Sequence, residues 1–161
     1  MRQRRAILIW WMVLVGAMDQ AVGFWARKTL SFYPRPIWGR HLTLVLLYNR
    51  GAMLGLGSSH ATLIAVLGVV GTLGLVIAAL LVRQGKWALA TMAGGALGNA
   101  ISRVFFSRVT DYIHVQGYPG VFNVSDMALR GGLLWFIALL VVQELSLRRG
   151  QPKPKSVALK P

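Results

Sequence analysis

The sequence contains no cysteine and only four acidic residues among its 161. Without cysteine, the chain can form no disulfide, no thiolate metal site and no cysteine nucleophile. Neither a G-x-S-x-G elbow nor a Ser-x-x-Lys motif provides a serine nucleophile. The histidines have no neighbouring metal ligands, so we expect no zinc site at His41, His60 or His114. The few carboxylates are therefore the first candidates for chemistry.

The chain also offers little polar surface, because 55% of its residues are hydrophobic. This composition excludes an ordinary soluble enzyme. The 18 Lys and Arg residues outnumber the acids and give a formal net charge of +14, which suits a membrane surface or a nucleic acid. We expect no nucleic-acid partner, because the basic residues flank hydrophobic runs and do not line one face of a soluble domain.

Four runs are apolar and long enough to cross a bilayer, which takes roughly 20 helical residues. They cover residues 6–25, 61–82, 87–104 and 125–147. These runs predict an all-α integral membrane protein with a membrane domain at residues 1–147 and a basic, disordered, cytoplasmic tail at residues 148–161. An even number of spans places both termini on one side, and the arginines beside the first and last runs favour the cytoplasm.

The first run has a second interpretation, which is a cleaved signal peptide. Basic residues precede it, and the small-residue sequence Val15-Gly16-Ala17 loosely resembles a cleavage site. Apolar residues continue beyond that point to Trp25. This continuation favours a retained span.

Small residues in two of the runs predict close helix packing. The third run repeats them at every fourth position, at Ala90, Gly94 and Gly98. The second run is expected to contact other helices through Gly68, Gly71 and Gly74. The pattern in the third run also leaves open a small structural or assembly subunit.

Two segments between the runs predict β-structure at the outer membrane boundary. Residues 42–47 are apolar and β-leaning, residues 48–51 form a turn signal, and residues 52–56 complete an expected hairpin or small sheet. Residues 109–115 alternate in polarity, which predicts a strand with Asp111 on its apolar face. A carboxyl group in that setting should have a raised pKa.

Three of the four acids, Asp19, Asp111 and Asp126, map to this same boundary. Asp126 falls in the first turn of the fourth helix, where the helix N-terminus favours the ionised form. If the chain reversal brings Asp111 and Asp126 together, they cannot both ionise easily and share a proton, as in aspartic proteases. A purely structural role is equally open, in which each aspartate caps a helix or pairs with Arg103, Arg108 or Arg130.

Other polar residues could support such a pair. Asn99, Ser102 and Arg103 share one face at the end of the third run. Asn123 precedes the fourth helix and could either cap it or orient a carboxylate.

Three stretches of the chain form a recognisable set: Gly94-Gly95-Ala96-Leu97-Gly98-Asn99-Ala100-Ile101-Ser102-Arg103, Val109-Thr110-Asp111-Tyr112-Ile113 and Phe122-Asn123-Val124-Ser125-Asp126. Two shorter ones are Asp19-Gln20 and Asn49-Arg50-Gly51-Ala52. In this order, and over nearly the whole chain up to about Leu147, they resemble the motifs of the lipoprotein signal peptidase, or signal peptidase II, family.

The resemblance implies a monomeric aspartic endopeptidase of the bacterial inner membrane, with four spans, a small periplasmic β-element and no cofactor. Such an enzyme acts near the periplasmic face, among phospholipids. It removes the signal peptide from diacylglyceryl-modified prolipoproteins just before the lipidated cysteine.

The resemblance also assigns roles to individual residues. Asp111 and Asp126 match the catalytic positions of the family. The positions that support this pair or face the substrate are matched by Asn99, Arg103 and Asn123 and by Asp19, Asn49 and Gly51.

The chain departs from the family pattern at several positions. Ser102 replaces an aspartate, Gly23 a lysine, Ser107 a glycine, and Met53-Leu54 an Ala-Phe pair. The change at Ser102 removes an expected partner of Arg103, which leaves that cation to find another acceptor. A catalytically silent membrane homologue that binds lipoproteins or lipids is therefore the alternative hypothesis.

Overall fold

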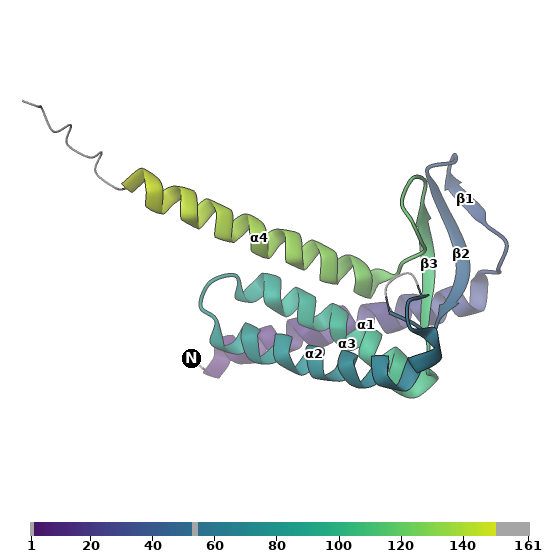
Figure 1. The fold of residues 1–161 in the computed structure, drawn as a ribbon, viewed down its shortest axis with the longest axis horizontal. Coiled ribbons are helices and arrows are strands. Elements are labelled where there is room, and N and C mark those ends of the chain that lie inside the picture. Colours follow the sequence, from purple (N-terminus) through teal and green to yellow (C-terminus); the bar gives the residue numbers. More distant parts are fainter. Residues whose placement is uncertain (1, 53–54, 151–161) are drawn as a thin grey trace, which may run out of the picture.

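The computed structural model describes residues 2–52 and 55–150, which fold into four long α-helices with a three-stranded sheet at one end (Figure 1). The helices are α1 (Arg2–Thr29), α2 (Ala61–Leu81), α3 (Lys86–Phe106) and α4 (Val124–Gly150). The strands are β1 (Arg35–Trp38), β2 (Leu42–Asn49) and β3 (Val109–Val115), and the short 3-10 helix η2 (Ser58–His60) leads into α2. The start of α1 and the end of α4 lie at the end of the molecule away from the sheet.

α3 is the central helix, and its small residues let its neighbours approach closely. Ala90 is fully buried. A Cβ atom added at Gly94 would lie 2.6 Å from the Cβ of Val15 on α1, and one at Gly98 would collide with Ser125 on α4. The close packing predicted for the small residues of the third run is therefore confirmed.

Three helical segments of the described chain are long and apolar enough to cross a membrane: Gln3–Thr29, Ser58–Leu81 and Val124–Arg149. They contain three of the four predicted spans. The remaining predicted span, residues 87–104, lies in α3, a helix of 21 residues that does not reach the same apolarity. Its small and polar residues, including Asn99 and Ser102, are buried against the other helices, which shield them from the surroundings.

The packing role predicted for the glycines of α2 is wrong. A Cβ atom added at Gly68, Gly71 or Gly74 would meet no neighbouring atom within 4 Å. α2 instead buries Thr72 and Ala79, and it leaves these glycines facing open space. The sequence could not reveal this rotation, because a helix that is apolar all round has no polar face to orient it.

The strand predicted at residues 42–47 and the small sheet are confirmed, but the predicted pairing of this strand with residues 52–56 is wrong. β2 continues to Asn49 and pairs with β1 on one side and β3 on the other, both antiparallel. Residues 55 and 56 belong to no strand, and the Ala52 N–H instead donates to the Leu56 carbonyl at 2.7 Å in a tight turn. The strand beside β2 at this edge of the sheet is β1 (Arg35–Trp38), which precedes β2 in the chain, and not residues 52–56.

The strand predicted at residues 109–115 is confirmed as β3. Its first four residues are all buried, so burial does not alternate along it as the sequence pattern predicts. The reason is that this half of the strand contacts α1 and α3, which cover it where it joins the helices. The register of the antiparallel pairing between β2 and β3 places Asp111 opposite Leu47 and Val109 opposite Asn49.

Candidate active site

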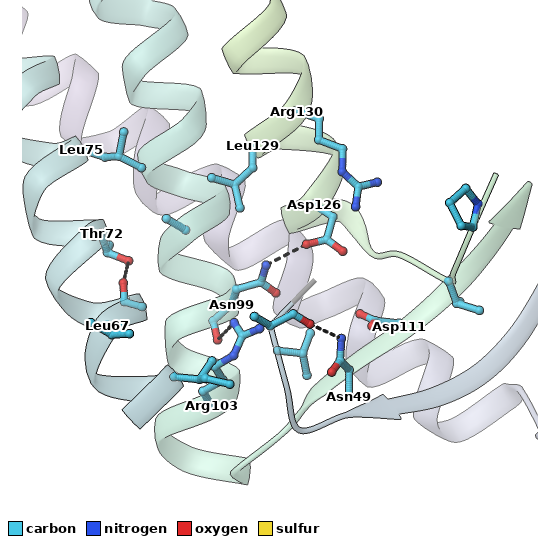
Figure 2. Close-up of a pocket in the computed structure, with 18 residues that line it drawn as sticks. Asn49, Leu67, Thr72, Leu75, Asn99, Arg103, Asp111, Asp126, Leu129 and Arg130 are labelled. Atoms are coloured by element: carbon cyan, nitrogen blue, oxygen red, sulfur yellow. Dashed lines mark hydrogen bonds between the residues drawn. The ribbon is translucent and has the colours of Figure 1, made fainter. Parts of the chain in front are cut away.

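Asp111 and Asp126 come from different elements and face the same cavity. Asp111 lies in the buried half of β3, and Asp126 lies in the first turn of α4. The cavity has a volume of about 650 Å³ and lies among α2, α3, α4 and the sheet (Figure 2). Most of its wall is apolar, and α2 contributes Ile64, Leu67, Gly68, Gly71, Thr72 and Leu75.

Two asparagine side chains bridge the carboxylates. The Nδ2 of Asn123 donates to Oδ1 of Asp111 at 2.8 Å and to Oδ1 of Asn99 at 3.2 Å. The Nδ2 of Asn99 in turn donates to Oδ1 of Asp126 at 3.0 Å. Because amide donors contact both carboxylates, the bridge fixes the orientation of each relative to the other.

The N-terminus of α4 is capped by side chains from three parts of the chain. The N–H of Asp126 donates to Oδ1 of Asn123 at 2.8 Å, so Asn123 caps the helix while it also orients Asp111. The N–H of Val124 donates to the Tyr112 hydroxyl at 3.2 Å, and the N–H of Ser125 donates to Asp19 at 2.9 Å. These bonds satisfy donors that a helix start leaves free, and they hold Asp126 in place.

Asp19, on α1, contacts the N-terminus of α4 and does not line the cavity. Its side chain is 4% exposed, and Gln20 Nε2 donates to its Oδ2 at 3.2 Å. Gln20 also donates to the Gly98 carbonyl at 2.9 Å and to Ser102 Oγ at 3.0 Å. The structure thus places Asp19 in a buried contact between α1 and the start of α4, and its match to a substrate-facing position of the family stays a prediction.

Gln20 was not among the predicted site residues. The signal for it is the resemblance of Asp19-Gln20 to a family motif, because a lone glutamine in an apolar run does not identify its hydrogen-bond acceptors. Ser102, which replaces an aspartate of the family pattern, accepts its hydrogen bond from Gln20 and not from Arg103. Where the family pattern has an aspartate that could pair with Arg103, this chain therefore has a serine in a neutral hydrogen bond with Gln20.

Arg103 finds its acceptors on the backbone. Its Nη2 donates to the Gly51 carbonyl at 3.0 Å, and its Nη1 donates to the Asn99 carbonyl at 3.4 Å. In residues 2–52 and 55–150, the ion pair within 4.0 Å is Arg148 with Glu144, so no arginine there forms a direct ion pair with Asp111 or Asp126. The structural alternative of arginine pairing is absent from this part of the chain.

Asn49 and Gly51 shape the turn beside Asp111. The Oδ1 of Asn49 accepts from the Gly51 N–H at 2.9 Å, and its Nδ2 donates to the Ala52 carbonyl at 3.1 Å. A Cβ atom at Gly51 would collide with the Gly55 carbonyl group, so this tight turn requires glycine. The departure at Met53-Leu54 lies outside the described residues.

Burial raises the pKa of Asp111 to about 7, because an apolar environment disfavours the ionised carboxylate. The nearby negative charge of Asp126 raises this pKa further. The side-chain amides of Asn49 and Asn123 and the charge of Arg103 oppose the rise. The direction agrees with the prediction from the strand pattern.

The described residues include no cluster of three or more His, Asp or Glu side chains able to hold a metal ion. The polar groups that line the cavity include the two carboxyl groups, the amides of Asn49 and Asn99, and the guanidinium groups of Arg103 and Arg130. One carboxyl of the pair is poised to carry a proton near neutral pH.

Two solved bacterial membrane enzymes share this fold. One, described as "Bacterial membrane enzyme structure by the in meso method at 2.3 A resolution", has a TM-score of 0.79 and 24% identity, with 91% of this chain and 94% of that chain covered. A second, at 1.9 Å resolution, has a TM-score of 0.75 and 26% identity, with 84% and 93% covered. Fold and apolar helices together define a multi-pass membrane protein.

Sequence comparison gives the family. The profile described as "Signal peptidase (SPase) II" matches residues 11–142. The lipoprotein signal peptidase of Burkholderia ambifaria is 35% identical over 150 residues, which are 86% of this chain and 87% of that protein. The lipoprotein signal peptidase of Hydrogenovibrio crunogenus is 30% identical over 152 residues, which are 86% and 85% of the two chains. The chain belongs to the signal peptidase II family.

Proposed function

We propose that the protein is an intramembrane aspartic endopeptidase that removes the signal peptide from diacylglyceryl-modified bacterial prolipoproteins, just before the lipidated cysteine. The observation that carries this proposal is the pair Asp111 and Asp126, bridged by Asn99 and Asn123 at the wall of an apolar cavity. Membership of the signal peptidase II family supports it.

In the proposed reaction the two carboxyl groups divide the work of acid and base. Asp126 takes a proton from a water molecule, whose oxygen attacks the scissile carbonyl carbon. Asp111, with a pKa of about 7, donates its proton to the carbonyl oxygen. When the tetrahedral gem-diol collapses, one of its hydroxyls returns a proton to Asp111 as the C=O bond re-forms, the C–N bond breaks, and the proton held by Asp126 passes to the leaving amine. Each turnover consumes one water molecule and returns the pair to its singly protonated state.

We further propose that α3 is the fourth span and that both termini are cytoplasmic. The starts and ends of the helices support this topology, because the sheet and Asp111 lie at the end opposite the basic start of α1 (Figure 1). The sheet then lies at the periplasmic face of the inner membrane. The substrate's signal helix and acyl chains would reach the cavity from the bilayer, and the enzyme works as a monomer among phospholipids.

No structural observation favours the silent homologue. Ser102 is tied to Gln20, away from both carboxylates. A side chain at Gly23 would meet only the guanidinium of Arg27, at 3.5 Å, so the missing lysine leaves no gap in the carboxylate network. The two departures that motivated that hypothesis therefore leave the bridged pair intact.

The test is cleavage of a lipid-modified prolipoprotein peptide by the purified protein in detergent. Asp111→Asn and Asp126→Asn should each lower kcat by about 10²-fold or more, because each removes a proton-transfer group. Glu144→Gln is the matched control, since Glu144 is the acid distant from the site and pairs only with Arg148 on the surface of α4. Unchanged cleavage by either aspartate variant would refute the mechanism. A wild-type protein that binds the lipopeptide without cutting it would support the silent homologue instead.

A further inference from the structure

Arg130 is a cation in the cavity wall that the proposed chemistry does not use. It lies on α4 one helical turn beyond Asp126 and lines the same cavity (Figure 2). In the described ranges 2–52 and 55–150, no carboxylate oxygen lies within 4.0 Å of its guanidinium, and none of its N–H groups makes a hydrogen bond. Its hydrogen-bonding capacity is therefore free for an occupant of the cavity.

Two aromatic rings hold this guanidinium in position. Its Cζ lies 5.1 Å from the ring centroid of Tyr118 and 5.6 Å from that of Phe122. The two rings themselves meet edge to face at 5.6 Å. A guanidinium over a ring is attracted through its flat face, which leaves the N–H donors on its edge available. A cation–π contact of this kind attracts Arg130 to the rings without requiring a hydrogen-bond acceptor.

The surroundings of Arg130 define what kind of group it can bind. Much of the cavity wall is aliphatic, with Leu67, Leu75 and Leu129 among its members. Arg130 is half-buried beside this wall, so its donors are open to a group that enters the cavity. An occupant that satisfies both parts of the cavity must bring acceptor oxygens for the arginine and hydrocarbon for the leucines. A glycerolipid ester has this composition.

We propose that Arg130 binds the ester carbonyl oxygens of the substrate's diacylglyceryl group. This inference rests on the proposed function and names the part of the substrate that the arginine contacts. In such a substrate the esters lie only a thioether and a glycerol away from the scissile amide. Arg130 follows Asp126 by four residues, about 6 Å of helix rise, so the two side chains can contact neighbouring parts of one substrate. The acyl chains then extend along the aliphatic wall.

Two synthetic prolipoprotein peptides test the assignment. They share one sequence and chain length, but one carries a diacylglyceryl group with ester links and the other a dialkylglyceryl group with ether links, which lacks the carbonyl oxygens. The wild-type protein should cleave the ester peptide with a kcat/KM about tenfold higher, through a lower KM, because a charged donor strengthens a hydrogen bond. Arg130→Met should remove this preference by slowing the ester peptide alone.

Arg108→Met is the matched control. Arg108 also stacks on an aromatic ring, with its Cζ 3.9 Å from the centroid of Tyr48, but it does not line the cavity. This variant should keep the ester preference of the wild type. The thermal midpoint of each variant, measured in the same detergent, reports whether the fold is retained.

Several outcomes would overturn the assignment. An Arg130→Met protein that keeps the wild-type ester preference would do so, as would equal slowing of both peptides. An effect of the substitution that appears only when anionic phospholipid is added would assign the guanidinium to a lipid phosphate instead. Failure of the wild type to cleave either peptide would refute the proposed function itself and the inference with it, and it differs from a lost ester preference.

Discussion

At the scale of single residues, Asn123 connects the helix start to the carboxylate pair. Its Oδ1 accepts from the Asp126 backbone, and its Nδ2 donates to Asp111 and to Asn99. A helix cap and a carboxylate contact are thus combined in one amide, which can donate and accept at once. An aspartate at this position could cap the helix but could not donate to Asp111 while ionised.

The proton held by Asp111 predicts the pH dependence of cleavage. Because burial raises its pKa to about 7, the carboxyl is protonated below that pH and loses the proton above it. Activity that needs this proton should therefore fall as the pH rises through about 7. The measurement is kcat against pH with saturating lipopeptide, and constant activity up to pH 9 would contradict the assignment of Asp111 as acid.

Substitution of Asn123 should shift the alkaline limb of the pH–activity profile, which is the fall of kcat as the pH rises through about 7. The hydrogen bond from Asn123 stabilises the ionised form of Asp111 and so lowers its pKa. Asn123→Ala is expected to shift the alkaline limb to higher pH and to lower the maximal kcat by about 10²-fold, because the pair loses its orientation. Gln143→Ala, at an exposed position on α4, is the control and should leave the profile unchanged. A limb that stays in place or moves to lower pH would count against the bridge.

At the scale of elements, the ends of α3 and α4 show how helix termini position the site. The start of α4 is held by Asp19, Tyr112 and Asn123, which come from a helix, a strand and a loop. The end of α3 turns sharply into β3 through Ser107, whose backbone is left-handed with φ of 54°. Asp111 follows this turn by only four residues, so the geometry of the turn sets where the strand enters the site.

Ser107 is expected to be a strained position, because side chains other than glycine rarely adopt this conformation. Ser107→Gly should stabilise the protein by about 1 kcal/mol, and raise the thermal midpoint by about 2–4 °C, by relieving the left-handed backbone. The measurement is thermal unfolding in detergent. Ser146→Gly, inside α4, is the matched control and should lower the midpoint, because glycine disfavours a helix interior. A destabilised Ser107→Gly protein would show that the serine side chain contributes more than the strain costs.

At the scale of the whole molecule, the candidate site lies at one end of the helices, and the basic start of α1 and basic end of α4 lie at the other (Figure 1). Three of the helices have the length and apolarity of membrane spans, and α3 is sheltered among them. Such an arrangement keeps the polar residues of α3 away from lipid while its Asn99 reaches the carboxylates. The helix that does not qualify as a span by its own apolarity thus supplies Asn99 to the bridge.

The proposed topology can be tested directly, because the chain has no cysteine of its own. His41→Cys, in the exposed turn between β1 and β2, should react with a membrane-impermeant maleimide in intact cells stripped of their outer membrane. Gln84→Cys, in the exposed turn between α2 and α3, should react only after permeabilisation. The opposite pattern would reverse the orientation, and labelling of both in sealed cells would refute the four-span topology.

The amino-acid sequence by itself determined the helices, the strand β3 and the choice of candidate carboxylates. Long apolar runs are local properties, and the scarcity of acids singled out Asp111 and Asp126 before any packing was known. Tertiary structure alone decided which strand pairs with β2, which way the glycines of α2 face, and that Asp19 is buried under α4 while Arg103 binds backbone carbonyls. These features depend on partners far along the chain, and neither the period nor the hydropathy of a segment specifies the partner against which it packs.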